Sequence, residues 1–122
     1  MKFMTIVKCA EMTEPPPEAL IDGIMALGEE AKQKGVFVDW GGLHPTATGA
    51  RVRIAKGKLT VTDGPFTEAK EVIGGFTIYD VASREEALDW VRRFMELHLK
   101  HFPGWEGETE IRQMFEEPPP EA

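Results

Sequence analysis

The stretch EVIGGFTIYDV, residues 71–81, limits the possible folds of this chain more than any other segment. It is rich in β-branched and aromatic residues, which favour strands, and its middle is apolar on both faces. A strand of this kind belongs in the interior of a sheet. Gly74 and Gly75 in its middle permit a β-bulge or the close approach of another backbone. The sequence therefore predicts a sheet in which residues 71–81 form a central strand.

Five further strands are predicted from apolar and alternating patterns. They span residues 2–9, 36–43, 50–55, 58–62 and 108–116. The third and fourth of them flank Lys56-Gly57-Lys58, which is typical of a hairpin turn. Apolar residues alternate in both hairpin strands with arginines or threonines, so one apolar and one polar face are expected.

Two helices are predicted from apolar residues at helical spacing. In residues 18–34 these residues stand at i, i+4, i+7 and i+11, and Gly35 is suited to end the helix. The second helix begins after Ser83, which is the N-cap of a capping box with Glu86, and it ends before Pro103.

The order β-α-β-β-β-β-α-β is that of a ferredoxin-like split βαβ with an inserted β-hairpin. We therefore expect an α+β fold with two helices on one face of an antiparallel sheet. The other face needs apolar cover, and a second copy of the chain is the usual source, so a homodimer is expected. Residues 1–116 form one domain, and residues 117–122 form an acidic, proline-rich tail that we expect to be disordered.

Charge and cysteine usage narrow the partners and the compartment. The net charge is −7, which argues against direct nucleic-acid binding because phosphates require a concentrated basic face. The densest basic stretch, residues 51–58, is interpreted as the solvated face of a strand pair. The single cysteine, Cys9, cannot form an internal disulfide, and no segment approaches the ~20 apolar residues of a membrane span. We expect a cytoplasmic protein without a membrane partner.

The stretch VTDGPFTEAKEVIGGF, residues 61–76, carries the motif Asp63-Gly64-Pro65-Phe66. Together with the rest of residues 42–91 and with EIRQMF at residues 110–115, it resembles the YCII-related proteins of the DGPF type. The resemblance implies a dimeric α+β barrel of ferredoxin-like halves and a small bacterial cytoplasmic protein, in a family without an established biochemical activity. Some relatives are fused or adjacent to extracytoplasmic-function sigma factors, which suggests a role in transcription initiation.

Two interpretations of Asp63 stay open. In the first, Asp63 bonds nearby backbone amides and Gly-Pro sets a sharp corner between strands. In the second, Asp63 is catalytic and forms an acid–base pair with His44, which lies in the loop GGLHP. The wider YCII family has a proposed His–Asp pair, but residues 10–35, where its histidine would lie, contain none here. Asp63 is the only residue carried over, and it would need a different partner.

Residues near this motif are candidates for binding a ligand. They are Arg53, Phe66, Glu68, Lys70, Glu71 and Gly75. Glu68 or Glu71 could act as an acid or base, Arg53 or Lys70 could hold an anionic group, and Phe66 could plug a core or an interface. The alternative for the run from Glu68 to Glu71 is a solvated charged surface.

The remaining reactive side chains point to structural roles. His98 and His101 are neighbours on the second helix, where they could stabilise its C-terminus as cations or hold a metal, but no third ligand is evident. No metal and no cofactor are expected, since the sequence has no phosphate loop, nucleotide fingerprint or paired-cysteine motif. Cys9 is interpreted as inert packing.

Two functions fit these observations, and whether the protein is an enzyme stays open. In the first, a homodimer binds or converts a small polar molecule in a cleft near the Asp-Gly-Pro-Phe corner. In the second, a non-catalytic module regulates a partner, as the sigma-factor context of the family suggests. The first predicts a concave pocket with Asp63 and a titratable neighbour, and the second predicts an exposed apolar patch elsewhere.

Overall fold

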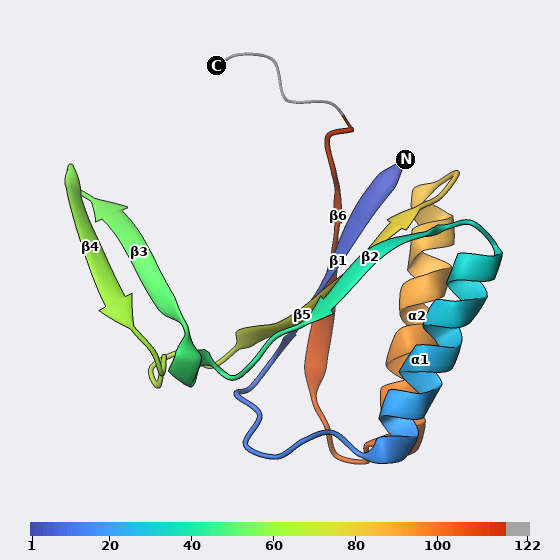
Figure 1. The fold of residues 1–122 in the computed structure, drawn as a ribbon, viewed down its shortest axis with the longest axis horizontal. Helices are drawn as coiled ribbons and strands as arrows, with labels where there is room; N and C mark the ends of the chain where they lie inside the picture. The colour runs from blue at the N-terminus through green and yellow to red at the C-terminus, as the bar shows by residue number, and fades with distance from the viewer. Residues whose placement is uncertain (117–122) are drawn as a thin grey trace.

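The computed structural model describes residues 1–116, and the tail expected at residues 117–122 lies outside the described residues. The elements follow in the order β1 (Lys2–Cys9), α1 (Glu18–Gln33), β2 (Phe37–Gly42), η1 (Thr46–Thr48), β3 (Ala50–Ala55), β4 (Lys58–Asp63), β5 (Val72–Asp80), α2 (Arg84–His101) and β6 (Gly107–Gln113) (Figure 1). The α+β class and the order of helices and strands are thus confirmed. No helix within residues 1–116 is long and apolar enough to cross a membrane.

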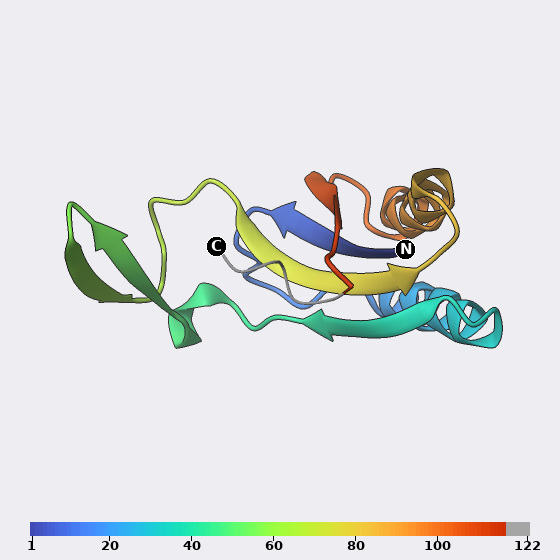
Figure 2. The same ribbon diagram turned by 90° about the horizontal axis from the view of Figure 1, so that it is seen from above.

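The main sheet has four antiparallel strands in the order β2-β5-β1-β6. β5 pairs with β1 on one side and with β2 on the other, so its predicted central position is confirmed. The bulge expected at the glycine pair is also present, because Val7 pairs with Gly75 whereas Lys8 pairs with Ile73. Both helices lie on the same side of this sheet (Figures 1 and 2).

The core lies between the two helices and one face of the sheet. Its buried members come from β1, α1, β5, the residue after β5 and α2: Phe3, Leu27, Ala31, Tyr79, Val81, Ala87 and Trp90. The rings of Tyr79 and Trp90 stack with their centroids 5.8 Å apart, and burial raises the pKa of Tyr79 to about 12. The predicted apolar line of α1 supplies Leu20, Leu27 and Ala31, whereas Met25 beside it is 56% exposed.

The helix ends follow from local sequence. α1 begins after Pro17, whose carbonyl accepts hydrogen bonds from the N–H groups of Leu20 and Ile21, and it ends where Gly35 adopts a φ of 72°. Ser83 is the N-cap of α2, and its hydroxyl accepts from the Glu86 N–H at 3.2 Å. The Glu86 carboxylate accepts from the N–H of Ala82. In the predicted capping box it would accept from the N–H of the N-cap residue, Ser83, so this second bond is shifted by one residue.

The sheet face away from the helices, here called the open face, carries a central apolar strip. Alternation along β1 and β5 places on this face the side chains opposite to buried Phe3 and Tyr79. The strip consists of Met4, Ile6, Ile73, Phe76 and Ile78, in which Met4 pairs with Ile78 and Ile6 with Phe76. Charged residues of β6 border it, and Glu110 bonds Lys8 at 2.5 Å and Arg112 at 3.1 Å.

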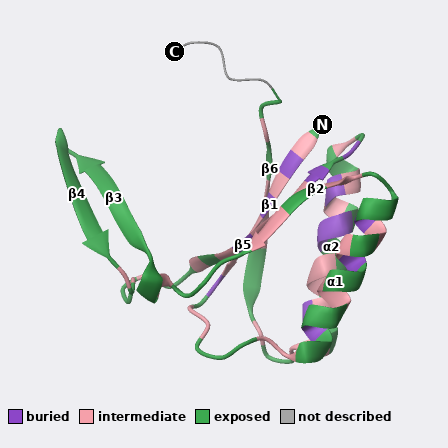
Figure 3. Ribbon diagram, in the orientation of Figure 1, coloured by how far each residue is buried: buried purple, intermediate pink, exposed green. Residues whose placement is uncertain are grey.

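The inserted hairpin does not join the main sheet. β3 and β4 pair only with each other, and this arm, residues 50–63, stands off the end of the main sheet in both views (Figures 1 and 2). The expected apolar face exists, since Val52 pairs with Val61 and Ile54 with Leu59. These four side chains are nevertheless 62–75% exposed, and the whole arm is coloured as exposed in Figure 3.

Candidate functional site

A cavity of about 900 Å³ opens between the main sheet and the two helices. Its walls come from the ends of β1, β2 and β5, from α1 and α2, and from residues 11–16 and 43–45. A volume of this size suits a metabolite-sized ligand, since such sites typically enclose about 300–1,000 Å³. Within residues 1–116, this cavity is a concave feature that could serve as a binding site.

Apolar and aromatic side chains form most of the cavity wall. α1 contributes Leu20 and Ile24, α2 contributes Phe94, and Trp40 and Trp105 close the wall from β2 and from the segment after α2. Gly28 allows Trp40 to lie against α1, because a Cβ at Gly28 would come within 3.1 Å of the indole ring. Such a lining favours a ligand with a ring or an aliphatic portion.

His98 is the main buried polar side chain of this wall. It is 7% exposed, and its ring lies between Phe94 and Trp105, with centroid distances of 4.8 Å and 4.3 Å. Nδ1 lies 3.0 Å from the carbonyl oxygen of Phe94, and because a carbonyl can only accept, Nδ1 must carry the proton. Nε2 is then an acceptor, and burial lowers the pKa of His98, which keeps the ring neutral near pH 7.

The Nε2 atom of His98 makes no hydrogen bond within residues 1–116. In the same part of the chain, no fully buried side-chain nitrogen or oxygen lacks a partner. Nε2 therefore keeps some accessible surface, and His98 lines the cavity. It offers one directed acceptor inside an otherwise mostly apolar wall. The interpretation of His98 as a cation that stabilises the helix C-terminus is wrong, since burial disfavours its charged form.

Two further polar side chains reach the cavity from the end of β1. Cys9 is 5% exposed, and burial raises the pKa of its thiol, so the thiolate needed for nucleophilic chemistry is disfavoured. Glu11 accepts hydrogen bonds from the backbone N–H of Thr46, at 3.2 and 3.3 Å, and from the Thr46 hydroxyl. Glu11 therefore ties the loop after β2 to the loop after β1 at the edge of the cavity.

The Asp-Gly-Pro-Phe corner packs against the same loop through backbone contacts. The Gly64 N–H donates to the carbonyl oxygen of Gly49 at 2.8 Å, and the Phe66 N–H donates to the Thr46 hydroxyl oxygen at 3.0 Å. A Cβ at Gly64 would overlap the carbonyl oxygen of Thr46, so only glycine fits there. These contacts show how the corner joins the arm to the body.

Arg51 of the arm completes this junction. Its guanidinium lies over the Phe66 ring, 3.8 Å from the centroid, and it forms an ion pair with Glu68. The pKa of Glu68 is lowered by a hydrogen bond from its own backbone N–H and by Arg51. Phe66 and Glu68, which the sequence suggested as ligand-binding residues, thus contact the base of the arm.

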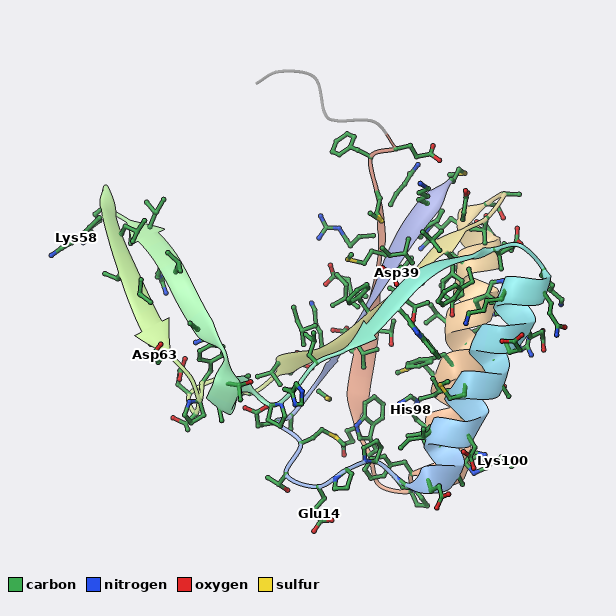
Figure 4. The ribbon with its side chains drawn as sticks, viewed as in Figure 1. Glu14, Asp39, Lys58, Asp63, His98 and Lys100 are labelled. Atoms are coloured by element: carbon green, nitrogen blue, oxygen red, sulfur yellow. The ribbon has the colours of Figure 1, made fainter. Side chains whose placement is uncertain are left out.

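The residues predicted for the site fall into two groups. His44 and Gly75 line the cavity, whereas Arg53, Asp63, Phe66, Glu68, Lys70 and Glu71 do not. Within residues 1–116, the side chains of His44 and Asp63 form no hydrogen bond with each other or with another residue. Figure 4 shows Asp63 at the end of β4 in the arm and His98 beside the helices. One copy of the chain does not bring His44 and Asp63 together, so their pairing as acid and base stays a prediction.

Sequence reasoning missed the aromatic part of the site. Trp40 and Trp105 were not singled out, and His98 was considered only for stabilising the helix C-terminus or for holding a metal. One signal was present, because His98 continues the helical line of Ala87, Val91 and Phe94, which predicts that it faces inward. Within residues 1–116, no group of three or more His, Cys, Asp or Glu side chains is placed to hold a metal ion.

Comparison with known proteins found one similar relative and one matching family. An uncharacterised protein of Rhizobium meliloti (strain 1021) is 48% identical over 50 residues, which make up 41% of this chain and 40% of that protein. The chain thus spans less than half the length of this relative. The model of the YCII-related domain matches residues 1–97, from β1 through most of α2. The chain belongs to the YCII-related family.

Proposed function

We propose that this protein is a homodimer that binds a small molecule in the cavity between the main sheet and the helices. The ligand combines a flat apolar portion with one hydrogen-bond donor. The apolar portion lies among Trp40, Phe94 and Trp105, and the donor is directed at Nε2 of His98. The expectation of a polar ligand beside the Asp-Gly-Pro-Phe corner is thereby replaced, because the cavity wall is largely aromatic and aliphatic.

The neutral form and the tautomer of the His98 ring are the observation that carries this proposal. A neutral imidazole with a fixed tautomer is a directed acceptor, since its Nδ1 proton is held by the Phe94 carbonyl. In an apolar wall, a polar acceptor that lacks a partner is costly to desolvate, so a ligand that donates to it is favoured over one that cannot. His98 could also take up a proton from such a donor, which would be the first step of a conversion.

Two probes of nearly equal shape test the hydrogen bond: 2-naphthol, whose hydroxyl can donate, and 2-methoxynaphthalene, which cannot. Binding is followed by NMR through the indole N–H signals of the tryptophans. Trp40 and Trp105 line the cavity, whereas Trp90 lies in the core and serves as an internal reference. We expect both probes to shift the first two signals, with 2-naphthol binding about 2–10-fold more tightly, as one hydrogen bond of about 0.5–1.5 kcal/mol allows.

The variant His98→Phe keeps an aromatic ring but removes the acceptor. It is expected to abolish the preference for 2-naphthol while 2-methoxynaphthalene still binds. His101→Phe is the matched control, because His101 is on the same helix but does not line the cavity. Equal affinity of the two probes for the wild-type protein would contradict the role of His98. The absence of shifts at Trp40 and Trp105 with either probe would contradict the cavity as a binding site.

The open face supports the homodimer. In one copy Ile73 of its strip is 51% exposed and the other four apolar side chains are only half-buried, and an apolar patch rimmed by charges is typical of a protein interface. We expect wild-type protein to elute with a light-scattering mass of twice the chain mass of 13.6 kDa. Ile6→Asn combined with Ile78→Asn should give monomers, whereas Leu99→Asn, at an 80% exposed position on α2, should not. A monomeric wild-type protein would refute the homodimer.

A further inference from the structure

The chain has two apolar surfaces that are incompletely covered within one copy. One is the strip on the open face, and the other is the apolar face of the arm, formed by Val52, Ile54, Leu59 and Val61. The arm points away from the end of the main sheet in both views, so it does not lie over the open face of its own copy (Figures 1 and 2). A two-stranded ribbon of this kind is only marginally stable alone and gains stability when its apolar face packs.

The base of the arm is held in a defined direction. Arg51 lies over Phe66 and pairs with Glu68, while Gly64 and Phe66 bond the loop after β2. This fixed attachment distinguishes the arm from a loop that could fold back over the body. An apolar ribbon presented in a fixed direction is suited to binding a second surface with little loss of conformational entropy.

The charge distribution indicates which surface the arm meets. Residues 50–63 carry four basic side chains and one acidic side chain, a net charge of +3, whereas the rest of the chain carries 10 basic and 20 acidic ones, a net charge of −10. Arg53, Lys56 and Lys58 have no carboxylate partner within residues 1–116. At the open-face border Glu110 is paired with Lys8 and Arg112, whereas Glu108 of β6 and Glu106 just before it are exposed and lack an ion-pair partner within residues 1–116. The arm is therefore complementary to the body of this chain in both polarity and charge.

We infer that the arm of each copy lies with its apolar face on the open face of a second copy of this chain. Each copy then donates one arm and receives one, which is the arrangement that a twofold axis produces. The basic side chains of the arm lie near the start of β6 in the partner, where the carboxylates of residues 106 and 108 are exposed. This inference rests on the homodimer proposed above and adds the segment that holds it together.

This mutual seating of arms, here called arm exchange, also gives the Asp-Gly-Pro-Phe corner a function. The corner sets the direction of the arm, and the loop that it braces through Thr46 carries His44 and Pro45 of the cavity wall. A partner that holds the arm therefore also holds this edge of the cavity. On this view the motif couples the dimer to the ligand site, and it needs no chemical role for Asp63.

Two pairs of substitutions on opposite faces of the arm test the exchange. Ile54→Asn with Leu59→Asn alters the apolar face, and Thr60→Asn with Thr62→Asn alters the polar face of the same strands. Dimer dissociation constants are measured by sedimentation velocity over a concentration series. We expect the first pair to weaken the dimer by about 100-fold or more, as loss of two central apolar contacts does, and the second pair to leave it within about threefold of wild type.

The dissociation constants also test arm exchange separately from the existence of the homodimer. If wild-type protein and the first pair form equally tight dimers, the dimer stands and arm exchange is overturned. If wild-type protein is monomeric with the arm exposed, both are overturned, and a regulatory module that binds another protein is favoured. Far-UV circular dichroism and thermal unfolding check that the body of each variant is folded.

Cross-linking distinguishes exchange from a contact within one copy. A photoreactive benzoylphenylalanine replaces Leu59 in ¹⁵N-labelled protein, which is then mixed with unlabelled wild-type protein and illuminated. We expect cross-linked peptides that join labelled β4 to unlabelled β1 or β5. Cross-links only between two labelled peptides of a single monomeric band would overturn the inference. Raising the salt concentration should weaken the wild-type dimer several-fold, because exposed charge pairs are screened.

Discussion

The four-stranded body sheet and the two-stranded arm both alternate apolar and polar residues along their strands, yet their apolar faces have different surroundings. In the body, Phe3 and Tyr79 are 4% and 5% exposed beneath two helices. In the arm, Val52 and Ile54 are 67% and 75% exposed, although they stand in the same kind of pattern. Alternation therefore predicts which side of a strand is meant to be covered, but not what covers it.

This difference gives the two regions different roles. The body has what a folded domain needs: two amphipathic helices, a covered sheet face and a stacked pair of rings at its centre. The arm contributes little to that core and is attached through the corner at residues 63–66. The body should therefore determine the stability of a single copy, and the arm should determine how one copy meets another.

The largest expected effect comes from deleting core atoms in the body. Leu27→Ala removes a side chain that is 7% exposed within the core, and we expect it to lower the free energy of unfolding by about 2–5 kcal/mol. Ile54→Ala removes a similar volume from the arm but should cost less than about 0.5 kcal/mol in a single copy. Urea unfolding at protein concentrations below the dimer dissociation constant measures both changes.

Leu27→Ala and Ile54→Ala also distinguish the body from the arm when unfolding is measured at high protein concentration. If the arm seats on a second copy, the effect of Ile54→Ala should grow with concentration, because only the dimer buries that side chain. The effect of Leu27→Ala should change much less. A large, concentration-independent cost of Ile54→Ala would mean that the arm packs within its own copy, contrary to its exposure.

The next effect concerns the junction between the two regions. Gly64→Ala would force a Cβ into the carbonyl oxygen of Thr46, and we expect a loss of about 1–3 kcal/mol, as overpacking generally costs. Gly42→Ala is the control, since a Cβ there meets nothing within 4 Å. Thermal unfolding gives the cost, and hydrogen exchange should show increased exposure of residues 44–49. Unchanged stability of Gly64→Ala would mean that the corner does not brace this loop.

Much of the fold could be predicted because the determinants of its elements are local. The Ser83 cap, the turn at Gly57, the helix end at Gly35 and the bulge near Gly74 each follow from one or a few neighbouring residues. The separation of the hairpin from the main sheet could not be predicted in this way. It depends on the direction in which residues 63–66 leave β4, which is set by backbone contacts to Thr46 and Gly49.

The site could be predicted only in part. The sequence pointed to Asp63 as a site residue because the Asp-Gly-Pro-Phe motif is unusual. In the structure, this motif attaches the arm to the body. The cavity is formed by residues distant in sequence, such as Val7, Trp40 and Trp105, and only the packing of the helices on the sheet brings them together. The tautomer and neutrality of His98 depend on burial and on its Phe94 contact, neither of which a residue pattern specifies.

The pH dependence of stability distinguishes the buried histidine from the surface carboxylates. Burial lowers the pKa of His98 below its ordinary value of 6.5, so near that pH the unfolded chain binds more protons than the folded one. Stability should therefore fall as the pH drops below about 6.5 and should be unaffected by this group above that value. Urea midpoints of wild type and His98→Phe between pH 7.5 and 5 measure the difference.

The control for this prediction is Glu30 on the body surface. Arg93 lowers the pKa of Glu30 from 4.5 to about 2 through bonds of 2.5 and 2.7 Å. Its contribution to stability is present above pH 4.5 and is lost as the pH falls toward 2. Glu30→Gln should therefore lower the midpoint by a constant amount above pH 4.5, keep the wild-type slope between pH 7.5 and 5, and converge with wild type as the pH falls toward 2. If His98→Phe shows the same slope as wild type between pH 6.5 and 5, the burial of a neutral His98 is contradicted.

The smallest expected effect compares the ion pair of the arm with that of the body. Glu68 and Arg51 are both exposed, so Glu68→Gln should leave the unfolding of the body nearly unchanged, as is usual for surface pairs. It should instead loosen the base of the arm, because Arg51 then keeps only its contact with Phe66. Hydrogen exchange of residues 50–55 should become faster in Glu68→Gln and stay unchanged in Glu30→Gln. Equal exchange in both variants would mean that Phe66 and the backbone bonds of Gly64 hold the arm without help from this charge pair.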